Sequence, residues 1–263
     1  MPDNDKDPKV AVKSKTGASL LPAIREQFKF IQDYTNSPKY KERLTKMVNA
    51  ERNLQGAINP NARFTNEVMS GSRVNTPTPQ VVQNVVDMNN QNLTDIGQGN
   101  ISVIGESLGT NVAGGFDSSM GDARLVEDLT RANPSVPAHE FSHGANDGRQ
   151  PYSPAFDEKY LKKVFIPATN SRFQGEVQKP TEVKARLDAI RYLGSKKGIY
   201  DAGKSDFTPA DYDKMIQDKE IKNDYNFKQI LDQLPSDRKK TGFIWLMNNI
   251  AKVKGDDADS NMA

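Results

Sequence analysis

The chain has 263 residues, with 36 lysine and arginine residues against 34 aspartate and glutamate residues, and it has no cysteine. The near-balance of charge gives no electrostatic case for binding nucleic acid, and the lack of cysteine excludes disulfides and thiolate metal ligands. No apolar run is long enough for membrane insertion and the polar start lacks a signal-peptide core, so we expect a soluble, cytoplasmic protein with a moderate hydrophobic core.

The N-terminal region is predicted to be a charged tail followed by helices. Residues 1–17 contain too little apolar surface to offset the entropy cost of ordering, so we expect them to be disordered. Apolar residues at helical spacing predict a helix over residues 19–36, and Ser37-Pro38 is typical of the start of a second helix. Residues 59–79 are rich in Asn, Pro, Ser and Thr, which indicates a linker. We therefore assign residues 18–75 to a helical extension and its linker.

The next part of the chain has a sequence pattern typical of a small β-sheet. Three short β-prone runs, at residues 101–104, 111–113 and 123–126, are separated by glycines and polar residues. Gly114-Gly115 is interpreted as a turn, because the surrounding residues match neither a P-loop nor a dinucleotide-binding motif.

Helices are predicted on both sides of this sheet. Each predicted helix begins with a recognisable dipeptide. It combines a Ser or Thr with a proline, or a Ser with an acidic residue. These dipeptides occur at Thr78-Pro79, Pro180-Thr181, Thr208-Pro209 and Ser236-Asp237. The fold class expected from these elements is α+β and mostly helical.

The only two histidines of the chain, His139 and His143, flank Glu140 in the sequence His-Glu-Phe-Ser-His. On a helix this H-E-x-x-H spacing places both imidazoles on one face, where they can bind the same Zn²⁺. The glutamate can then polarise a water molecule for attack on a carbonyl. We expect this helix to have Ser135 as its N-cap and to stop at Gly148.

A third protein ligand for zinc has to be a carboxylate, because the chain offers no other histidine and no cysteine. Three candidates follow the motif. Asp147 lies one helical turn after His143 and could instead orient that histidine, Glu176 lies in an irregular segment, and Glu182 opens a helix 39 residues after His143. Arg186, four residues after Glu182, is expected to pair with it in either case.

The motif followed by a helix that bears a glutamate resembles the zincin metallopeptidases, in particular the small gluzincins. The resemblance covers roughly residues 97–195 and is specific at the five-residue motif. It implies a zincin-like core with a small sheet before the active-site helix. We place this metallopeptidase domain at residues 76–253, between the helical N-terminal region and a flexible tail at residues 254–263.

The same resemblance implies a set of site residues and an activity. His139, His143 and Glu182 would be the zinc ligands, and Glu140 would be the general base. The implied reaction is hydrolysis of peptide bonds in a protein or peptide substrate. The strand at residues 123–126 would align an extended substrate by edge pairing.

We also make predictions for two tyrosines and for two further stretches of the sequence. Tyr192 and Tyr200 are expected either to stabilise an oxyanion or, as is commoner, to pack in the core. In their general sequence pattern, residues 180–186 and 245–251 look similar to virion proteins of tailed phages of gut bacteria. That resemblance implies an alternative: a structural or assembly protein located in the virion, with other virion proteins as partners and a vestigial or structural metal site.

Overall fold

The computed structural model describes most of the chain, in several ranges. These are residues 8–12, 17–58, 78–99, 101–105, 114–117, 120–146, 158–167, 175 and 177–250, with the secondary structure alone for residues 50–58 and 158–160. Within these ranges no helix combines the length and the apolar character needed to cross a membrane.

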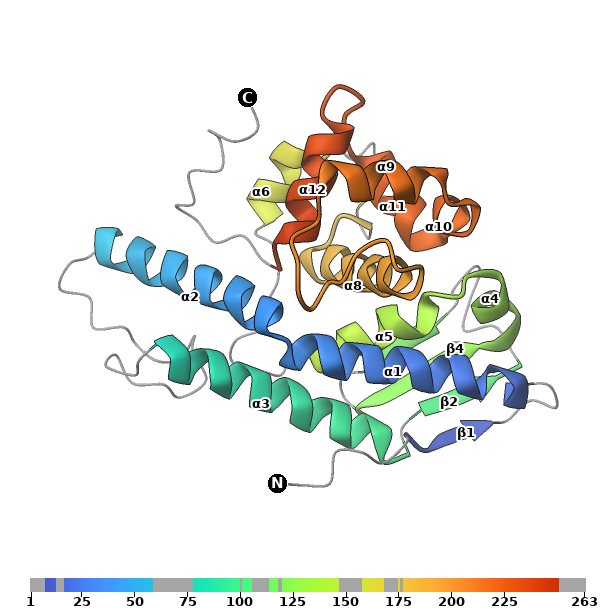
Figure 1. Cartoon of the computed structure of the whole chain (residues 1–263). Coiled ribbons are helices and arrows are strands. Elements are labelled where there is room, and N and C mark those ends of the chain that lie inside the picture. The colour runs from blue at the N-terminus through green and yellow to red at the C-terminus, as the bar shows by residue number, and fades with distance from the viewer. Residues whose placement is uncertain are drawn as a thin grey trace.

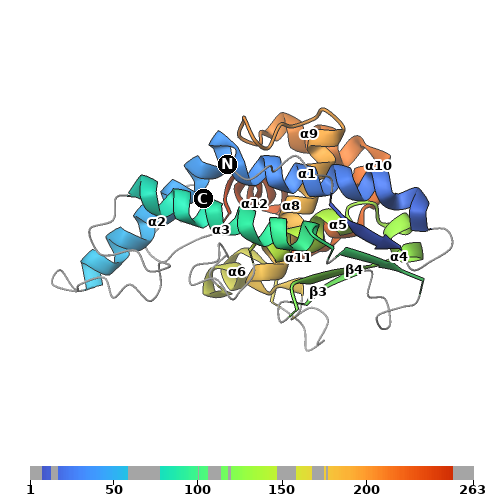
Figure 2. The ribbon, with the colours of Figure 1, turned by 90° about the horizontal axis from the view of Figure 1, so that it is seen from below.

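Three long helices lie where the sequence predicts helices in the N-terminal part of the chain. They are α1 (Leu21–Asn36), which is preceded by the short 3-10 helix η1 (Gly17–Leu20), α2 (Pro38–Ile58) and α3 (Thr78–Gly97). The predicted start of α2 is confirmed, because the Ser37 hydroxyl accepts a hydrogen bond of 3.1 Å from the backbone N–H of Tyr40. Figure 2 shows α2 and α3 side by side, and the C-terminal end of α3 leads to the sheet.

A four-stranded mixed sheet has the order β1-β2-β4-β3. Its strands are β1 (Val10–Val12), β2 (Ile101–Ile104), β3 (Gly114–Asp117) and β4 (Asp122–Val126). The first three strands in this order run parallel, with Ile101 of β2 opposite both Val10 and Ala123, and β3 runs antiparallel to β4.

Three expectations about the sheet are wrong. Residues 10–12 are not part of a disordered tail, because they pair with β2, and the apolar Val10 packs against the core. Gly114-Gly115 is strand rather than turn, because both residues pair with β4. The run at residues 123–126 is a strand, as predicted, but it does not offer an edge to a substrate, since β2 and β3 pair with its two edges. The run expected at residues 111–113 lies outside the described residues.

The remaining helices follow the sheet strands β2, β3 and β4 along the chain. They are α4 (Glu127–Ala132), α5 (Val136–Ala145), α6 (Glu158–Val164), α8 (Pro180–Lys196), α9 (Pro209–Gln217), α10 (Lys219–Asn223), α11 (Tyr225–Gln233) and α12 (Lys239–Asn248). Helix α5 packs against β3 and β4 on one side and against α1, α3 and α8 on the others (Figure 1). This mostly helical α+β arrangement agrees with the predicted fold class.

One hydrophobic cluster connects the N-terminal helices with the rest of the molecule. It contains buried residues from α1, α2, α3, the sheet, α5, α8 and the C-terminal helices. The ring of Phe28 on α1 meets that of Phe141 on α5 edge-to-face, with ring centroids 5.2 Å apart. The helices predicted as an N-terminal extension therefore share a core with the helix that carries the two histidines.

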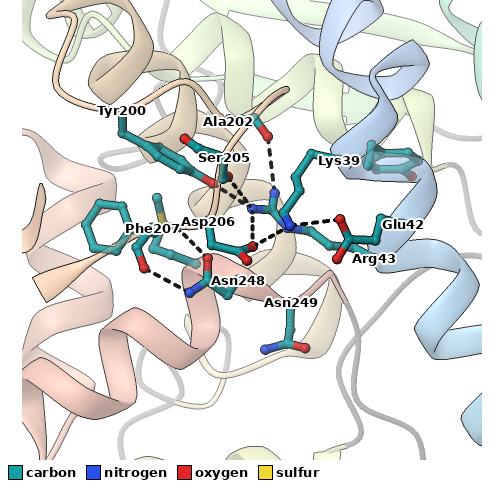
Figure 3. A network of polar contacts seen from close by, with 12 residues as sticks. Lys39, Glu42, Arg43, Tyr200, Ala202, Ser205, Asp206, Phe207, Asn248 and Asn249 are labelled. Carbon is teal, nitrogen blue, oxygen red and sulfur yellow. Dashed lines mark hydrogen bonds and ion pairs between the residues drawn. The ribbon is translucent and has the colours of Figure 1, made fainter.

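A buried arginine also ties α2 to the chain after α8 (Figure 3). The guanidinium of Arg43 donates hydrogen bonds to the Tyr200 hydroxyl at 2.7 Å and to the backbone carbonyls of Ala202 and Ser205 at 3.4 and 3.3 Å. It also donates to the hydroxyl of Tyr34 at 3.1 Å. We call this set the Arg43 network; it fixes the segment 200–205 against α2.

Candidate metal centre

Helix α5 carries the His-Glu-x-x-His motif in the middle of the molecule. Pro137 lies in its first turn, where a missing N–H costs nothing, and the helix ends at Ala145. Ser135 stands at the N-cap position, but its hydroxyl does not cap the helix; it donates to Asp224 at 2.6 Å instead. The predicted N-cap position of Ser135 is confirmed, although its side chain does not cap the helix. The predicted stop at Gly148 lies outside the described residues.

Helix α8 presents Glu182 to this motif. Pro180 occupies the first turn of α8, and a carboxylate there is favoured by the positive end of the helix dipole. Val183 and Leu187 are buried on one face of α8 and fix the helix against the core. Glu182 lies in the first turn of α8, and its carboxylate is directed toward α5, opposite the two histidines.

Three potential ligand atoms converge between α5 and α8. The Nε2 atoms of His139 and His143 are 3.1 Å apart. Oε2 of Glu182 lies 3.4 Å from Nε2 of His139, and Oε1 lies 3.2 Å from Nε2 of His143. The three residues form a group that could hold a metal ion, since each offers one ligand atom within 4.8 Å of the others.

The separations fit a tetrahedral zinc site. With metal–ligand bonds of about 2.0–2.1 Å, neighbouring donor atoms of a tetrahedron are about 3.3 Å apart. The N–N separation is 3.1 Å, and the two N–O separations, each to a different oxygen of Glu182, are 3.4 and 3.2 Å, so a small turn of the carboxylate would bring one oxygen to both nitrogens. In addition, two imidazole nitrogens facing each other at 3.1 Å repel through their lone pairs unless a proton or a cation lies between them. The donor set therefore suits a divalent cation.

Glu140 lies beside this group and is almost fully buried. Its side chain packs against the backbone of β3, because a Cβ at Gly114 would be only 2.8 Å from Oε1 of Glu140. Burial raises the pKa of this carboxyl to about 7. A carboxyl with a pKa near neutrality can both accept and return a proton under physiological conditions.

The ionisation of the three donors is set by burial and by their mutual contacts. Burial lowers the pKa of His139 to about 4, so its imidazole is neutral at pH 7 and offers a lone pair. Burial also acts to lower the pKa of His143, but the hydrogen bond and the charge of Glu182 outweigh it and raise the pKa. Burial acts to raise the pKa of Glu182, and its hydrogen bonds with both histidines outweigh that and lower the pKa well below its usual range.

The other sequence candidates have different outcomes. Asp147 and Glu176 lie outside the described residues. The predicted pairing of Arg186 with Glu182 is confirmed by an ion pair of 3.2 Å. Tyr192 and Tyr200 are buried core residues whose hydroxyls contact Glu26 and Arg43, respectively, as the core interpretation predicts.

Two sets of buried polar residues around the site were not predicted. Asp188 on α8 accepts hydrogen bonds from Ser142 of the motif helix and from two cations, Lys184 and Arg191. Asn226 on α11 accepts one from Arg186. The spacing of the charges of α8 was visible in the sequence, but charges at this spacing are usually found on a solvated helix face.

Comparisons with known proteins give no further identification. No protein-family model, no curated protein and no solved structure matches this chain.

Proposed function

We propose that the protein is a zinc-dependent peptidase in which His139, His143 and Glu182 bind the ion and Glu140 is the general base. One observation carries the proposal. The two Nε2 atoms and the Glu182 carboxylate meet, with one ligand atom from each residue within 4.8 Å of the others, next to a buried carboxyl whose pKa is raised to about 7. Two imidazoles and a carboxylate are the ligand set found in several zinc peptidases.

The number of donors supports a catalytic rather than a structural site. Structural zinc sites have four protein ligands, whereas catalytic sites have three and leave one position open. In the part of the chain that the structure describes, the group contains three residues with ligand atoms. A bound zinc ion would act as a Lewis acid that polarises the substrate carbonyl and lowers the pKa of water.

The role of Glu140 follows from its surroundings. Without a bound ion, burial raises the pKa of its carboxyl to about 7, well above that of an exposed glutamate. It can therefore take a proton from the attacking water and give it to the leaving amine. The packing of the side chain against Gly114 limits the positions that the carboxylate can adopt.

Strand β3 is the best placed element for aligning a substrate. It is the last strand in the sheet order, and its Gly114 lies against Glu140. An extended peptide that pairs with this edge would run past the general base, with main-chain hydrogen bonds giving affinity. We therefore assign substrate alignment to β3 rather than to β4, because both edges of β4 are already paired.

The substitution Glu140→Gln tests the proposal. We expect the variant to bind one zinc ion, because the three donors are unchanged, and to lose about 10²–10⁴-fold in peptide hydrolysis. Zinc content is measured by elemental analysis, and hydrolysis with an unfolded protein substrate and a quenched fluorescent peptide library. Glu127→Gln is the matched control, since Glu127 is buried to a similar degree on α4 and is paired with Arg131.

The outcomes separate the two functions considered. Full hydrolysis by Glu140→Gln rules out the proposed mechanism. Stoichiometric zinc in a wild-type protein that cleaves none of these substrates would instead support a structural metal site, as expected for a virion component.

A further inference from the structure

Glu182 is held by a chain of hydrogen bonds that returns to the start of α5. Nη2 of Arg186 donates to Oε2 of Glu182 at 3.2 Å, and Nη1 donates to Oδ1 of Asn226 at 3.1 Å. Nδ2 of Asn226 donates to the Ser135 hydroxyl at 2.8 Å, and that hydroxyl donates to Asp224 at 2.6 Å. Since Ser135 directly precedes α5, the chain closes a ring from α5 through α8 and α11 back to α5.

The middle of this ring is shielded from water. Arg186 is 7 % exposed, and Asn226, Ser135 and Asp224 are exposed by 3 % or less. A hydrogen bond lost from such a site is not replaced by water, so each group in the ring depends on its neighbours. The direction of the donors is also determined, because the Ser135 hydroxyl gives its one proton to Asp224 and can only accept from Asn226.

The orientation of the Arg186 guanidinium depends on Asn226. The guanidinium lies over the ring of Tyr225, 5.4 Å from its centroid, which leaves it free to turn in its own plane. Nε of Arg186 has no hydrogen-bond partner among the described residues. The hydrogen bond from Nη1 to Asn226 therefore fixes the orientation in which Nη2 of Arg186 points to Glu182.

Glu182 itself needs this support. Its side chain is 27 % exposed and has the rotamer freedom to turn toward solvent. The contact with Arg186 keeps one carboxylate oxygen engaged and so turns the carboxylate to the two histidines.

We infer that Asn226 and Ser135 are positioning residues of the metal centre: they fix Arg186, which holds the Glu182 carboxylate in place for the ion. The inference rests on the metal binding in the proposed function. It assigns α11, which carries no ligand, a part in metal affinity. Partners of this kind, which contact a ligand and not the metal, typically change metal affinity by about 10–100-fold when they are removed.

The test compares zinc affinity in Asn226→Ala, Ser135→Ala and the wild type, measured on purified protein by competition with a coloured chelator. We expect both variants to bind zinc about 10–100-fold more weakly. Asn89→Ala is the matched control, because Asn89 is also a buried amide and donates to the Tyr40 hydroxyl in a hydrogen bond of 3.0 Å that is not part of the ring. Its zinc affinity should stay within about twofold of the wild type.

Two measurements distinguish a positioning role from a general loss of folding stability. Urea unfolding of the zinc-free proteins measures the stability lost by each variant. The inference is overturned if Asn226→Ala and Ser135→Ala bind zinc like the wild type, or if Asn89→Ala weakens zinc binding as much as they do. If one of the two variants does not fold, the other decides.

The same measurements separate this inference from the peptidase activity. A wild-type protein that binds zinc, cleaves no peptide and loses affinity in Asn226→Ala would support the positioning role and contradict the proposed function. A wild-type protein that binds no zinc would overturn both.

Discussion

The backbone of Gly114 lies directly against the side chain of Glu140. A Cβ at position 114 would be 2.8 Å from Cγ and from Oε1 of Glu140 and 3.0 Å from its Cδ, closer than real Cβ contacts. The strand and the carboxyl approach this closely only because residue 114 has no side chain. Strand β3 thus fixes the position of the proposed general base as well as one edge of the sheet.

The substitution Gly114→Ala should therefore reduce hydrolysis while leaving the metal in place. The added methyl group displaces the Glu140 carboxyl, and a displacement of about 1 Å in a reacting group costs about 10²-fold in rate. Zinc content should remain stoichiometric, because the three atoms nearest to the added methyl group all belong to Glu140 and the three metal-binding residues are unchanged. Steady-state kinetics with parallel elemental analysis checks both statements.

Gly175→Ala is the control for this substitution. A Cβ at Gly175 would meet no atom within 4 Å, so the variant should keep wild-type rates. Wild-type rates in Gly114→Ala as well would show that β3 does not constrain Glu140.

Zinc should stabilise the protein through the donors of both helices. A ligand that binds only the folded state adds about 2.7 kcal/mol at a concentration of 100 times its Kd. We expect the thermal unfolding midpoint to rise on adding zinc and to fall on adding a chelator. In His139→Ala, which lacks one donor, neither addition should change the midpoint. A zinc-dependent rise of wild-type size in His139→Ala would place the ion elsewhere.

The substitution Asp188→Asn should destabilise the protein strongly at neutral pH. Asp188 contacts the buried cations Lys184 and Arg191 at 2.6 and 2.7 Å, and removing its charge leaves both cations buried with no countercharge. Breaking a buried ion pair in this way costs about 3–5 kcal/mol. Urea unfolding at pH 7 measures the loss. Asp33→Asn, whose side chain is 65 % exposed and pairs with Lys29, should cost less than about 0.5 kcal/mol.

The effect of Asp188→Asn should depend on pH. Burial acts to raise the pKa of Asp188, but Lys184 and Arg191 outweigh it, so the pKa in the folded protein is lower than in the unfolded chain. The charged form therefore contributes stability above the unfolded pKa of about 3.9, and this contribution is lost as the pH falls through the folded pKa. The difference between the wild type and Asp188→Asn should shrink below about pH 4. A difference that stays constant from pH 7 to pH 3 would contradict this account.

The substitution Arg43→Met should loosen the N-terminal helices from the rest of the molecule. It removes four hydrogen bonds and leaves the Tyr200 hydroxyl and two carbonyls without their donor. We expect a loss of about 3 kcal/mol in the free energy of unfolding, since each buried group left unsatisfied costs about 1–3 kcal/mol. The wild type should unfold in a single transition, because α1 and α2 share its core.

Lys46→Met is the control on the same helix. Lys46 is exposed and forms a surface ion pair with Glu42, so its loss should change stability by less than about 0.5 kcal/mol. Equal losses in both variants would mean that the Arg43 network does not hold α2.

The helices and the central part of the site could be predicted because their signals are local. Proline near a helix start, apolar residues at helical spacing and two histidines one turn apart each act within one element, so α1, α3, α5 and α8 appear where the sequence predicts them. The need for a carboxylate left three candidates open, and the choice of Glu182 among them came from the resemblance to the gluzincins; the structure brings Glu182 and the histidines together.

The missed features depend on partners that lie far away in the sequence. Residues 10–12 become a strand through pairing with β2, about ninety positions later, and Gly114 is a strand residue because β4 pairs with it. Asn226 acquires its role only where α11 approaches Arg186 and Ser135. No local pattern identifies a buried amide or glycine as part of a site when its contacts are this remote.

The Arg43 network also sets an order of events during biosynthesis. Arg43 and its acceptor Ser205 are 162 positions apart, and at about 5–20 residues per second a ribosome needs about 10–30 s to make the chain between them. Throughout that interval the emerging α2 carries a guanidinium for which Tyr34 has been made but the partners at residues 200–205 have not. The N-terminal helices therefore cannot finish packing as they emerge, and the nascent chain exposes their apolar faces until the segment after α8 has left the ribosome.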